Sequence, residues 1–293
     1  MKTPIFEGAG VAIVTPFNAD GSINYEKFAE LIDFQVKNHT DAIIVCGTTG
    51  EASTTSDEEH QALIRFAVQR VKGRVPVIAG TGSNDTEYAT YLSIKAKEDG
   101  ADALLLVTPY YNKTSQAGLV AHFKHTADRV DLPIILYNVP SRTGVCIAVD
   151  TYKELSEHKN IVAAKEASGN ISHIAKVAAE TDLVIYSGND DQITPIMSLG
   201  AKGVISVSSN CIPKETHDIV DLYLKGRVKE SCELQLKYLD FMNNLFCDVN
   251  PIPVKEAMNL MGMNVGECRL PLVGLSTDNK EKLKNSMKKI GLI

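Results

Sequence analysis

IVAAKEAS, at residues 161–168, is a short apolar run that ends in a lysine and a glutamate. A strand that is apolar along its whole length suits a parallel sheet that is covered on both faces. Similar runs recur along the chain, and each except the last is rich in Val, Ile or Leu. The sequence therefore predicts eight strands, at residues 11–17, 42–47, 75–81, 103–108, 133–138, 161–165, 183–187 and 203–208.

Amphipathic stretches separate these runs and predict helices. The helix at 57–71 follows Ser56, which we expect to be its N-cap, with Glu59 in the capping-box position. Eight strand–helix units favour an α/β fold of the (β/α)8 type, a closed TIM barrel. A doubly wound sheet is the alternative, but no G-x-G-x-x-G follows the first strand. The expected barrel helices lie at residues 25–37, 57–71, 87–98, 118–129, 151–157, 171–180, 192–199 and 213–224.

The strand pattern stops after about Gly226, and helices are expected at residues 228–246, 254–261 and 280–290. The segment Asn250-Pro251-Ile252-Pro253 separates the first two, because proline cannot continue a helix. We therefore expect two parts. Residues 1–225 form a catalytic barrel, and residues 226–293 form a C-terminal helical domain.

Composition excludes several classes of protein. The chain has 293 residues and a net charge of −6, which argues against a nucleic-acid binder. No apolar run reaches the roughly 20 residues that a membrane-spanning helix needs, and no secretory signal is visible, so we expect a cytoplasmic protein without membrane contact. Six cysteines without a C-x-x-C pair predict reduced thiols and no metal site.

Polar residues gather where the predicted strands end, which in a barrel is the active-site face. Gly47-Thr48-Thr49-Gly50-Glu51 offers two hydroxyls and free N–H groups that can hold a carboxylate, although an ordinary turn is equally compatible. Arg142, after the fifth strand, can bind a carboxylate through two parallel hydrogen bonds or form a surface ion pair. Tyr110 and Tyr111 can present a phenol or simply pack. In Ser187-Gly188-Asn189-Asp190-Asp191, glycine leaves room for a substrate and the acids can cap the next helix.

Lys165 is the strongest single candidate for a catalytic residue. At an ordinary pKa near 10.4, roughly one lysine amine in a few thousand is uncharged at pH 7, and burial lowers that pKa. A buried lysine usually attacks a carbonyl to form a Schiff base. The alternatives are a lysine that reaches solvent from the strand end, or one paired with Glu166. Strand ends with Thr, Tyr, Arg and Lys, but no His, indicate a site for a small anionic carbonyl compound.

These motifs occur in the order found in one known family. The chain resembles the dihydrodipicolinate synthase family of pyruvate-dependent class I aldolases nearly end to end, including the segment Asn250-Pro251-Ile252-Pro253-Val254-Lys255. The resemblance implies a lyase that condenses pyruvate with aspartate 4-semialdehyde to 4-hydroxy-tetrahydrodipicolinate. This reaction is the first committed step of lysine (diaminopimelate) biosynthesis. The iminium is itself the electron sink, so no cofactor is implied.

The resemblance also implies roles for single residues. Lys165 would form the Schiff base with pyruvate, and Tyr137 would shuttle protons through Thr48 to Tyr111. That last tyrosine enters the neighbouring subunit's site, which implies at least a dimer and commonly a tetramer, a dimer of dimers. The implied substrate-binding residues are Thr48 and Thr49 for the pyruvate carboxylate, Arg142 for the aspartate semialdehyde carboxylate, and Gly188 and Ile205 through the backbone.

Some members of this family are inhibited by lysine, which binds at the dimer interface. Here Asp57 replaces a histidine of the inhibited pattern, and Tyr88 stands where a glutamate would bind the ligand's amine. We therefore predict weak or absent lysine inhibition. The matching positions of this possible regulatory site are Ala52, Ser53, Asp57, His60, Asn84, Tyr88 and Tyr110.

Two other functions stay open at this point. Relatives with the same architecture, such as N-acetylneuraminate lyase or keto-deoxy-gluconate aldolase, share the lysine and the tyrosine. Arg142, in the context Ser-Arg-Thr-Gly, favours a short second substrate with a carboxylate. A barrel that binds a keto acid without catalysis is the alternative from another class, and the complete Tyr, Thr and Lys set argues against it.

Overall fold

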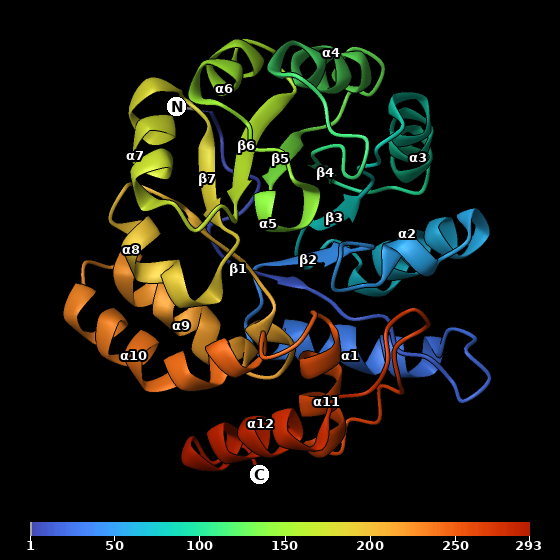
Figure 1. The fold of residues 1–293 in the computed structure, drawn as a ribbon, viewed down its shortest axis with the longest axis vertical. Coiled ribbons are helices and arrows are strands. Elements are labelled where there is room, and N and C mark those ends of the chain that lie inside the picture. Colours follow the sequence, from blue (N-terminus) through green and yellow to red (C-terminus); the bar gives the residue numbers. More distant parts are fainter. Residues whose placement is uncertain (1) are drawn as a thin grey trace.

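The computed structural model describes residues 2–293 and contains a closed barrel of eight parallel strands. Each strand pairs with the next along the chain, and β8 pairs with β1 to close the barrel (Figure 1). The predicted (β/α)8 barrel is therefore confirmed. The strands are β1 (Gly8–Ala12), β2 (Ala42–Val45), β3 (Val77–Gly80), β4 (Ala103–Val107), β5 (Ile134–Asn138), β6 (Ile161–Glu166), β7 (Val184–Ser187) and β8 (Gly203–Ser206).

Helices cover the outside of this barrel. The predicted capping box before α2 is present, because the Ser56 hydroxyl accepts from the Glu59 amide and the Glu59 carboxylate accepts from the Ser56 amide. The helix predicted at 192–199 is shorter, with a 3-10 turn at Asp190–Gln192 before it. The surrounding helices are α1 (Tyr25–Lys37), α2 (Asp57–Val71), α3 (Thr86–Glu98), α4 (Gln116–Ala127), α6 (Val149–Ser156), α7 (Ile171–Glu180), α8 (Ile193–Met197) and α9 (Pro213–Leu224).

The first strand lies earlier than the predicted 11–17, and that prediction is wrong. β1 ends at Ala12, and hydrogen bonds to other loops then hold the segment that follows. The Val14 amide donates to the Asn210 side chain at 3.1 Å, and the Thr15 hydroxyl donates to the Gly50 carbonyl at 2.7 Å. A strand ends where its hydrogen bonds to the neighbouring strands end, and a local apolar pattern carries no information on those distant partners.

A helix of four residues that the sequence pattern did not predict follows β5. This helix, α5 (Pro140–Thr143), begins with proline and ends at Gly144, whose φ is 73°. The Thr108 hydroxyl at the end of β4 donates to the Thr143 hydroxyl at 3.0 Å, which fixes α5 over the barrel. A single helical turn has no periodic signature, so only the structure reveals that α5 carries Arg142.

The C-terminal helices α10 (Val228–Asn244), α11 (Ile252–Leu260) and α12 (Thr277–Lys289) gather on the side of α1 and α9 (Figure 1). Lys255 of α11 is 2% exposed and donates to the Glu51 carboxylate at 2.9 Å. Since a buried charge requires a close partner, this ion pair joins the C-terminal helices to the loop after β2. That residues 226–293 are a separate domain stays a prediction. No helix within residues 2–293 is long and apolar enough to cross a bilayer.

Candidate active site

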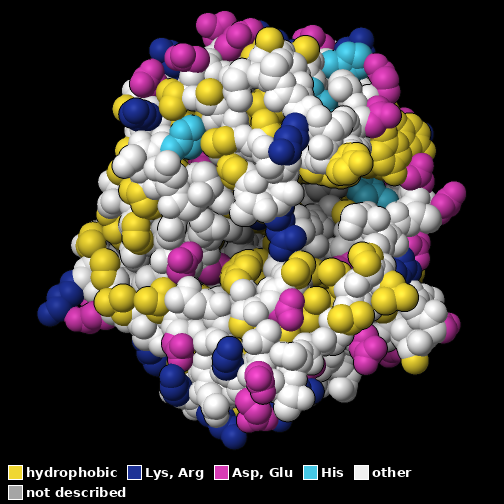
Figure 2. Space-filling view, viewed as in Figure 1, with side chains coloured by type: hydrophobic (Ala, Val, Ile, Leu, Met, Phe, Trp, Pro, Cys, Tyr) yellow, Lys and Arg dark blue, Asp and Glu magenta, His cyan; other side chains and the backbone are white. Residues whose placement is uncertain are grey.

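A cavity of about 870 Å³ opens at the carboxyl ends of the strands. Figure 2 shows the hollow at the centre of this face, with apolar side chains along the rim nearest the C-terminal helices. Its walls come from the loops after β2 and β7, from α5, and from residues 246–250 between α10 and α11. The C-terminal helical part therefore forms one side of the cavity rather than an appendage remote from it.

Lys165 and Tyr137 lie side by side on the floor of this cavity. They are register partners on β6 and β5, and the Lys165 Nζ lies 4.3 Å from the centre of the Tyr137 ring. Lys165 is 6% exposed, so the lysine that reaches solvent from the strand end is ruled out. The prediction of a buried lysine is confirmed.

The alternative of an ion pair between Lys165 and Glu166 is wrong. Successive strand residues point to opposite faces, so Glu166 lies outside the barrel. Its carboxylate accepts from the Asn138 amide at 3.0 Å, from the Tyr152 hydroxyl at 2.6 Å and from the Ser168 hydroxyl at 2.8 Å. These three donors satisfy the buried carboxylate without any contribution from Lys165.

Burial lowers the pKa of Lys165 to about 8. The negative charge of Asp190 acts in the opposite direction, and the guanidinium of Arg142 lowers the pKa further. At that pKa about one tenth of the amine is uncharged at pH 7, a gain of a few hundredfold over an ordinary lysine. The site therefore supplies a usable nucleophile near neutral pH.

The pKa of Tyr137 is shifted in the opposite direction to that of Lys165. Burial raises the pKa of its phenol, and this effect outweighs the opposing influences of Arg142 and of the Thr48 side chain. The phenol is thus protonated near neutral pH and lies beside the amine. A protonated hydroxyl can donate one hydrogen bond and accept others, which suits proton transfer at this position.

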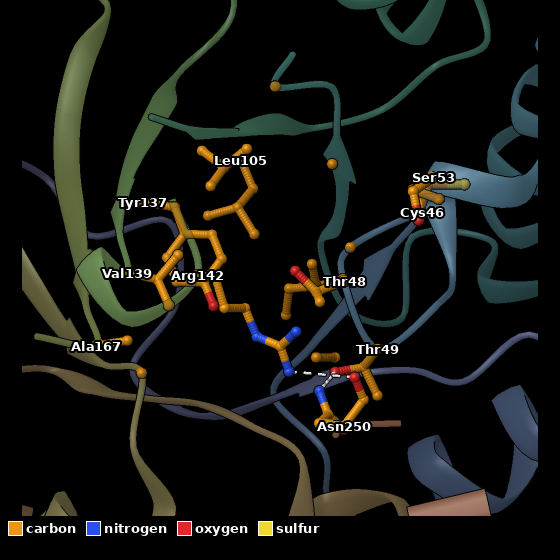
Figure 3. A pocket seen from close by; sticks show the side chains of 18 of the residues that line it. Cys46, Thr48, Thr49, Ser53, Leu105, Tyr137, Val139, Arg142, Ala167 and Asn250 are labelled. Atoms are coloured by element: carbon orange, nitrogen blue, oxygen red, sulfur yellow. Dashed lines mark hydrogen bonds between the residues drawn. The ribbon is translucent and has the colours of Figure 1, made fainter. Parts of the chain in front are cut away.

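Thr49, Arg142 and Asn250 form a hydrogen-bonded group at the mouth of the cavity (Figure 3). The Asn250 side-chain Nδ2 donates to the Thr49 hydroxyl at 3.0 Å. The Arg142 guanidinium donates to the Asn250 backbone carbonyl at 3.2 Å. The sequence marks Asn250 as part of a helix break and of a segment that carries the family resemblance, but it predicts no role for this residue in the site. The contact of Asn250 with Thr49 spans 201 positions along the chain.

Gly188 lies directly against the lysine. A Cβ at this position would come within 2.7 Å of the Ala167 Cβ and 3.1 Å of the Lys165 Cε, so only glycine leaves Lys165 undisturbed. The prediction that Asp190 caps the next helix is wrong. Its carboxylate instead accepts from the Val207 and Ser208 amides, both at 3.0 Å, at the end of β8. Burial raises the pKa of Asp190.

The remaining predicted residues are distributed between the cavity and the surface. Ile205 is buried on β8 and is not among the residues that line the cavity. Tyr111, in contrast, is 90% exposed and has a positive φ of 71°. The structure thus does not bring Tyr111 into the cavity of its own chain, whereas Thr48, Thr49, Tyr137, Arg142, Lys165 and Gly188 all line it.

Five of the predicted regulatory positions, Ala52, Ser53, His60, Tyr88 and Tyr110, line an extension of the same cavity. The Tyr88 hydroxyl donates to the Asp57 carboxylate at 2.5 Å. Burial and this contact raise the pKa of Tyr88 to about 12. The backbone carbonyl of Asn84 accepts from Asn112, next to Tyr111. The two residues that depart from the inhibited pattern therefore bind each other.

Comparisons with known proteins find one family over nearly the whole chain. A family model described as "Dihydrodipicolinate synthetase family" matches residues 5–290. A 4-hydroxy-tetrahydrodipicolinate synthase from Caldicellulosiruptor saccharolyticus is 58% identical over 290 residues, which cover 99% of this chain and 98% of that protein. The crystal structure of dihydrodipicolinate synthase from Aquifex aeolicus is 48% identical with a TM-score of 0.95, covering 98% and 99% of the two chains. A structure described as the first monomeric dihydrodipicolinate synthase variant is 41% identical with a TM-score of 0.96, covering 99% and 98%.

Proposed function

The chain belongs to the dihydrodipicolinate synthetase family, and from this premise we propose that it condenses pyruvate with aspartate 4-semialdehyde through a Schiff base on Lys165. It is an enzyme, a lyase of the class I aldolase type that acts in lysine biosynthesis. One observation carries the assignment of the nucleophile. Lys165 is a buried amine whose pKa is lowered to about 8, beside the phenol of Tyr137.

The reaction begins when the Lys165 amine attacks the ketone carbon of pyruvate. The ketone oxygen takes one proton from the amine and a second from the Tyr137 phenol and leaves as water, and an iminium remains. Loss of a methyl proton gives an enamine, because the iminium accepts the released electron pair. The enamine carbon attacks the aldehyde, whose oxygen takes a proton. The amine of the aspartate semialdehyde then displaces Lys165 to close the ring.

Tyr137 moves the protons in this sequence. Its phenol is protonated near neutral pH, so it can donate to the departing hydroxyl and later recover a proton. Thr48 connects it to Tyr111, whose 90% exposure suits a residue that completes the site of another copy. The relay of Tyr137, Thr48 and Tyr111 is thus assembled from two subunits.

The carboxylates of the two substrates have separate partners. Thr48 and Thr49 hold the pyruvate carboxylate near Lys165, while Arg142 at the cavity mouth binds the carboxylate of aspartate semialdehyde. Gly188 lines the cavity, and its backbone contacts the ligand. Ile205 does not line the cavity, so its backbone contact with the ligand stays a prediction.

The protein assembles as a homodimer and further as a tetramer, in the cytoplasm. Support comes from the aromatic face formed by Tyr88, Tyr91, Tyr110 and Tyr111, all at least 39% exposed. Contiguous exposed aromatic side chains mark a surface that another protein covers. Sedimentation equilibrium gives the assembly directly, and a monomer that turns over at full rate would contradict the shared relay.

The first experiment is intact-protein mass spectrometry after incubation with pyruvate and borohydride, followed by peptide mapping. Reduction traps the iminium as a stable amine, so we expect a single pyruvate adduct on Lys165. A turnover assay with pyruvate and aspartate semialdehyde separates an enzyme from a barrel that only binds. A folded protein without an adduct would overturn the Schiff-base mechanism.

A further inference from the structure

We propose that Asn250 is a positioning residue for the pyruvate carboxylate, because its side-chain amide directs the proton of the Thr49 hydroxyl toward the ligand. The inference rests on the proposed function, in which Thr49 holds that carboxylate. It adds a residue from the C-terminal helical part to the machinery of the barrel. The same residue, through its backbone carbonyl, receives a hydrogen bond from Arg142.

Asn250 joins parts of the site that come from distant segments. It is 5% exposed and lies in the segment between α10 and α11, where that segment reaches the cavity mouth. Figure 3 shows Arg142, Thr49 and Asn250 converging, with Thr49 from the loop after β2 and Arg142 from α5. Within residues 2–293 the side chain of Asn250 makes a hydrogen bond to Thr49 alone, while its backbone carbonyl accepts one from Arg142. These two contacts can therefore be changed separately.

The direction of the hydrogen bond decides what Thr49 can do. A threonine hydroxyl has one proton to donate and two lone pairs that accept. Asn250 donates to the Thr49 oxygen at 3.0 Å and so occupies a lone pair. In residues 2–293 the Thr49 side chain makes no other hydrogen bond, which leaves its proton for a ligand. A carboxylate only accepts, so it is the matching partner.

The side-chain carbonyl oxygen of Asn250 also indicates that this residue serves as a hydrogen-bond donor to Thr49. Oδ1 is buried and has no hydrogen-bond partner in the described chain. A buried polar atom without a partner costs free energy, and such atoms require a reason other than packing. A side chain selected for stability alone would satisfy both ends of its amide, whereas one selected for its donor leaves the acceptor end unpaired.

The segment that carries Asn250 is anchored by the helix that follows it. Lys255, on the next helix, donates to Glu51 at 2.9 Å and to the Glu267 carbonyl at 2.7 Å. The second Glu51 oxygen accepts from the Arg269 amide at 2.9 Å. Because Glu51 ends the loop that carries Thr49, this buried pair fixes the distance between Thr49 and Asn250 independently of their own hydrogen bond.

The variant Asn250→Asp tests the proposal with little change in shape. It replaces the donor with an acceptor, which takes the Thr49 proton and adds a negative charge near the pyruvate carboxylate. We expect the KM for pyruvate to rise at least about tenfold, as for loss of a hydrogen bond to a charged group. The KM for aspartate semialdehyde changes less than about twofold, because the backbone carbonyl that binds Arg142 is retained.

A pH profile separates positioning from a structural effect. The introduced carboxyl gains a proton as the pH falls, and once protonated it can donate to Thr49 again. Burial raises the pKa of this carboxyl, and the nearby Arg142 guanidinium acts in the opposite direction. The ratio of kcat/KM for pyruvate, variant over wild type, should therefore rise as the pH falls. Asn250→Ala removes the donor without adding a charge. Its kcat/KM for pyruvate, relative to wild type, should therefore stay below one and not change with pH.

Asn279→Ala is the matched control. Asn279 of α12 donates to the Cys247 carbonyl at 3.1 Å, so it anchors the same segment from outside the cavity. We expect an unchanged KM for pyruvate. Wild-type-like pyruvate kinetics in both Asn250 variants would overturn the proposal, as would an equal defect in Asn279→Ala. Absence of a pyruvate adduct in the wild type would instead overturn the proposed function, and this inference with it.

Discussion

Asn138 donates a hydrogen bond of 3.0 Å to the buried carboxylate of Glu166, one position beyond Tyr137 and Lys165 on the same two strands. The catalytic pair faces the inside of the barrel, and this second pair faces the outside. The outer pair therefore holds β5 and β6 in register at the level where Tyr137 meets Lys165. Tyr152 of α6 donates to the same carboxylate and fixes the helix layer there as well.

Removal of the Glu166 carboxylate should destabilise the fold. Glu166→Ala leaves the buried donors of Asn138, Tyr152 and Ser168 without their acceptor, and we expect the free energy of unfolding to fall by about 3 kcal/mol. Urea denaturation measures this change. Glu154→Ala is the control, because Glu154 is in an exposed ion pair worth less than about 1 kcal/mol. Equal losses in the two variants would contradict the role of Glu166.

The rate of Schiff-base formation should follow the ionisation of Lys165. Because the pKa of this amine is lowered to about 8, the uncharged fraction rises with pH up to that value and levels off above it. We expect the initial rate of borohydride-trapped adduct formation to show the same dependence. A rate that still climbs near pH 10 would mean that the amine has an ordinary pKa. Lys165→Arg should form no adduct at any pH.

Loss of the Arg142 guanidinium should weaken binding of aspartate semialdehyde and leave the reaction of pyruvate with Lys165 in place. Arg142→Ala removes the proposed partner of the aspartate semialdehyde carboxylate. We expect the KM for aspartate semialdehyde to rise about tenfold to a hundredfold. Pyruvate adduct formation on Lys165 should persist, with its pH dependence moved to higher pH, since Arg142 contributes to the lowered pKa of the lysine. Unchanged kinetics with both substrates would show that Arg142 binds neither.

A single methyl group at Gly188 should reduce activity. Gly188→Ala places a Cβ 3.1 Å from the Lys165 Cε and 2.7 Å from the Ala167 Cβ, so the lysine must shift. Since a displacement of about 1 Å can cost a hundredfold in rate, we expect kcat to fall between about tenfold and a hundredfold. Gly274→Ala is the control, because nothing lies within 4 Å of its Cβ. Similar kcat values in both variants would mean that the site accommodates the methyl group.

Free lysine should inhibit this enzyme weakly or not at all. The ligand's ammonium group lacks a carboxylate at position 88, and the Tyr88 hydroxyl is already bonded to Asp57. The double variant Asp57→His with Tyr88→Glu supplies the missing carboxylate without a neighbouring like charge, and we expect it to become sensitive. Initial rates across a lysine titration measure both proteins. Wild-type inhibition at submillimolar concentration would refute the prediction.

Local patterns in the sequence were sufficient for the barrel and for most of the site. Apolar runs such as β4 specify buried parallel strands, because a strand that is covered on both faces is apolar at every position. Lys165 and Thr49 could be found for a related reason, since polar residues after such strands must lie at the same end of the barrel. The same logic misplaced β1, whose end depends on Asn210 nearly two hundred residues away.

The sequence by itself determined the order of strands and helices, the face on which the polar residues lie and the family that the chain resembles. Only the tertiary structure decided that Glu166 turns away from Lys165, that α5 carries Arg142 to the cavity and that Asn250 lines the cavity mouth. The physical reason is the range of the interactions. Periodicity and capping act over a few neighbouring residues, whereas burial, pKa shifts and the bond between Asn250 and Thr49 depend on atoms that only the closed barrel and its C-terminal helices bring together.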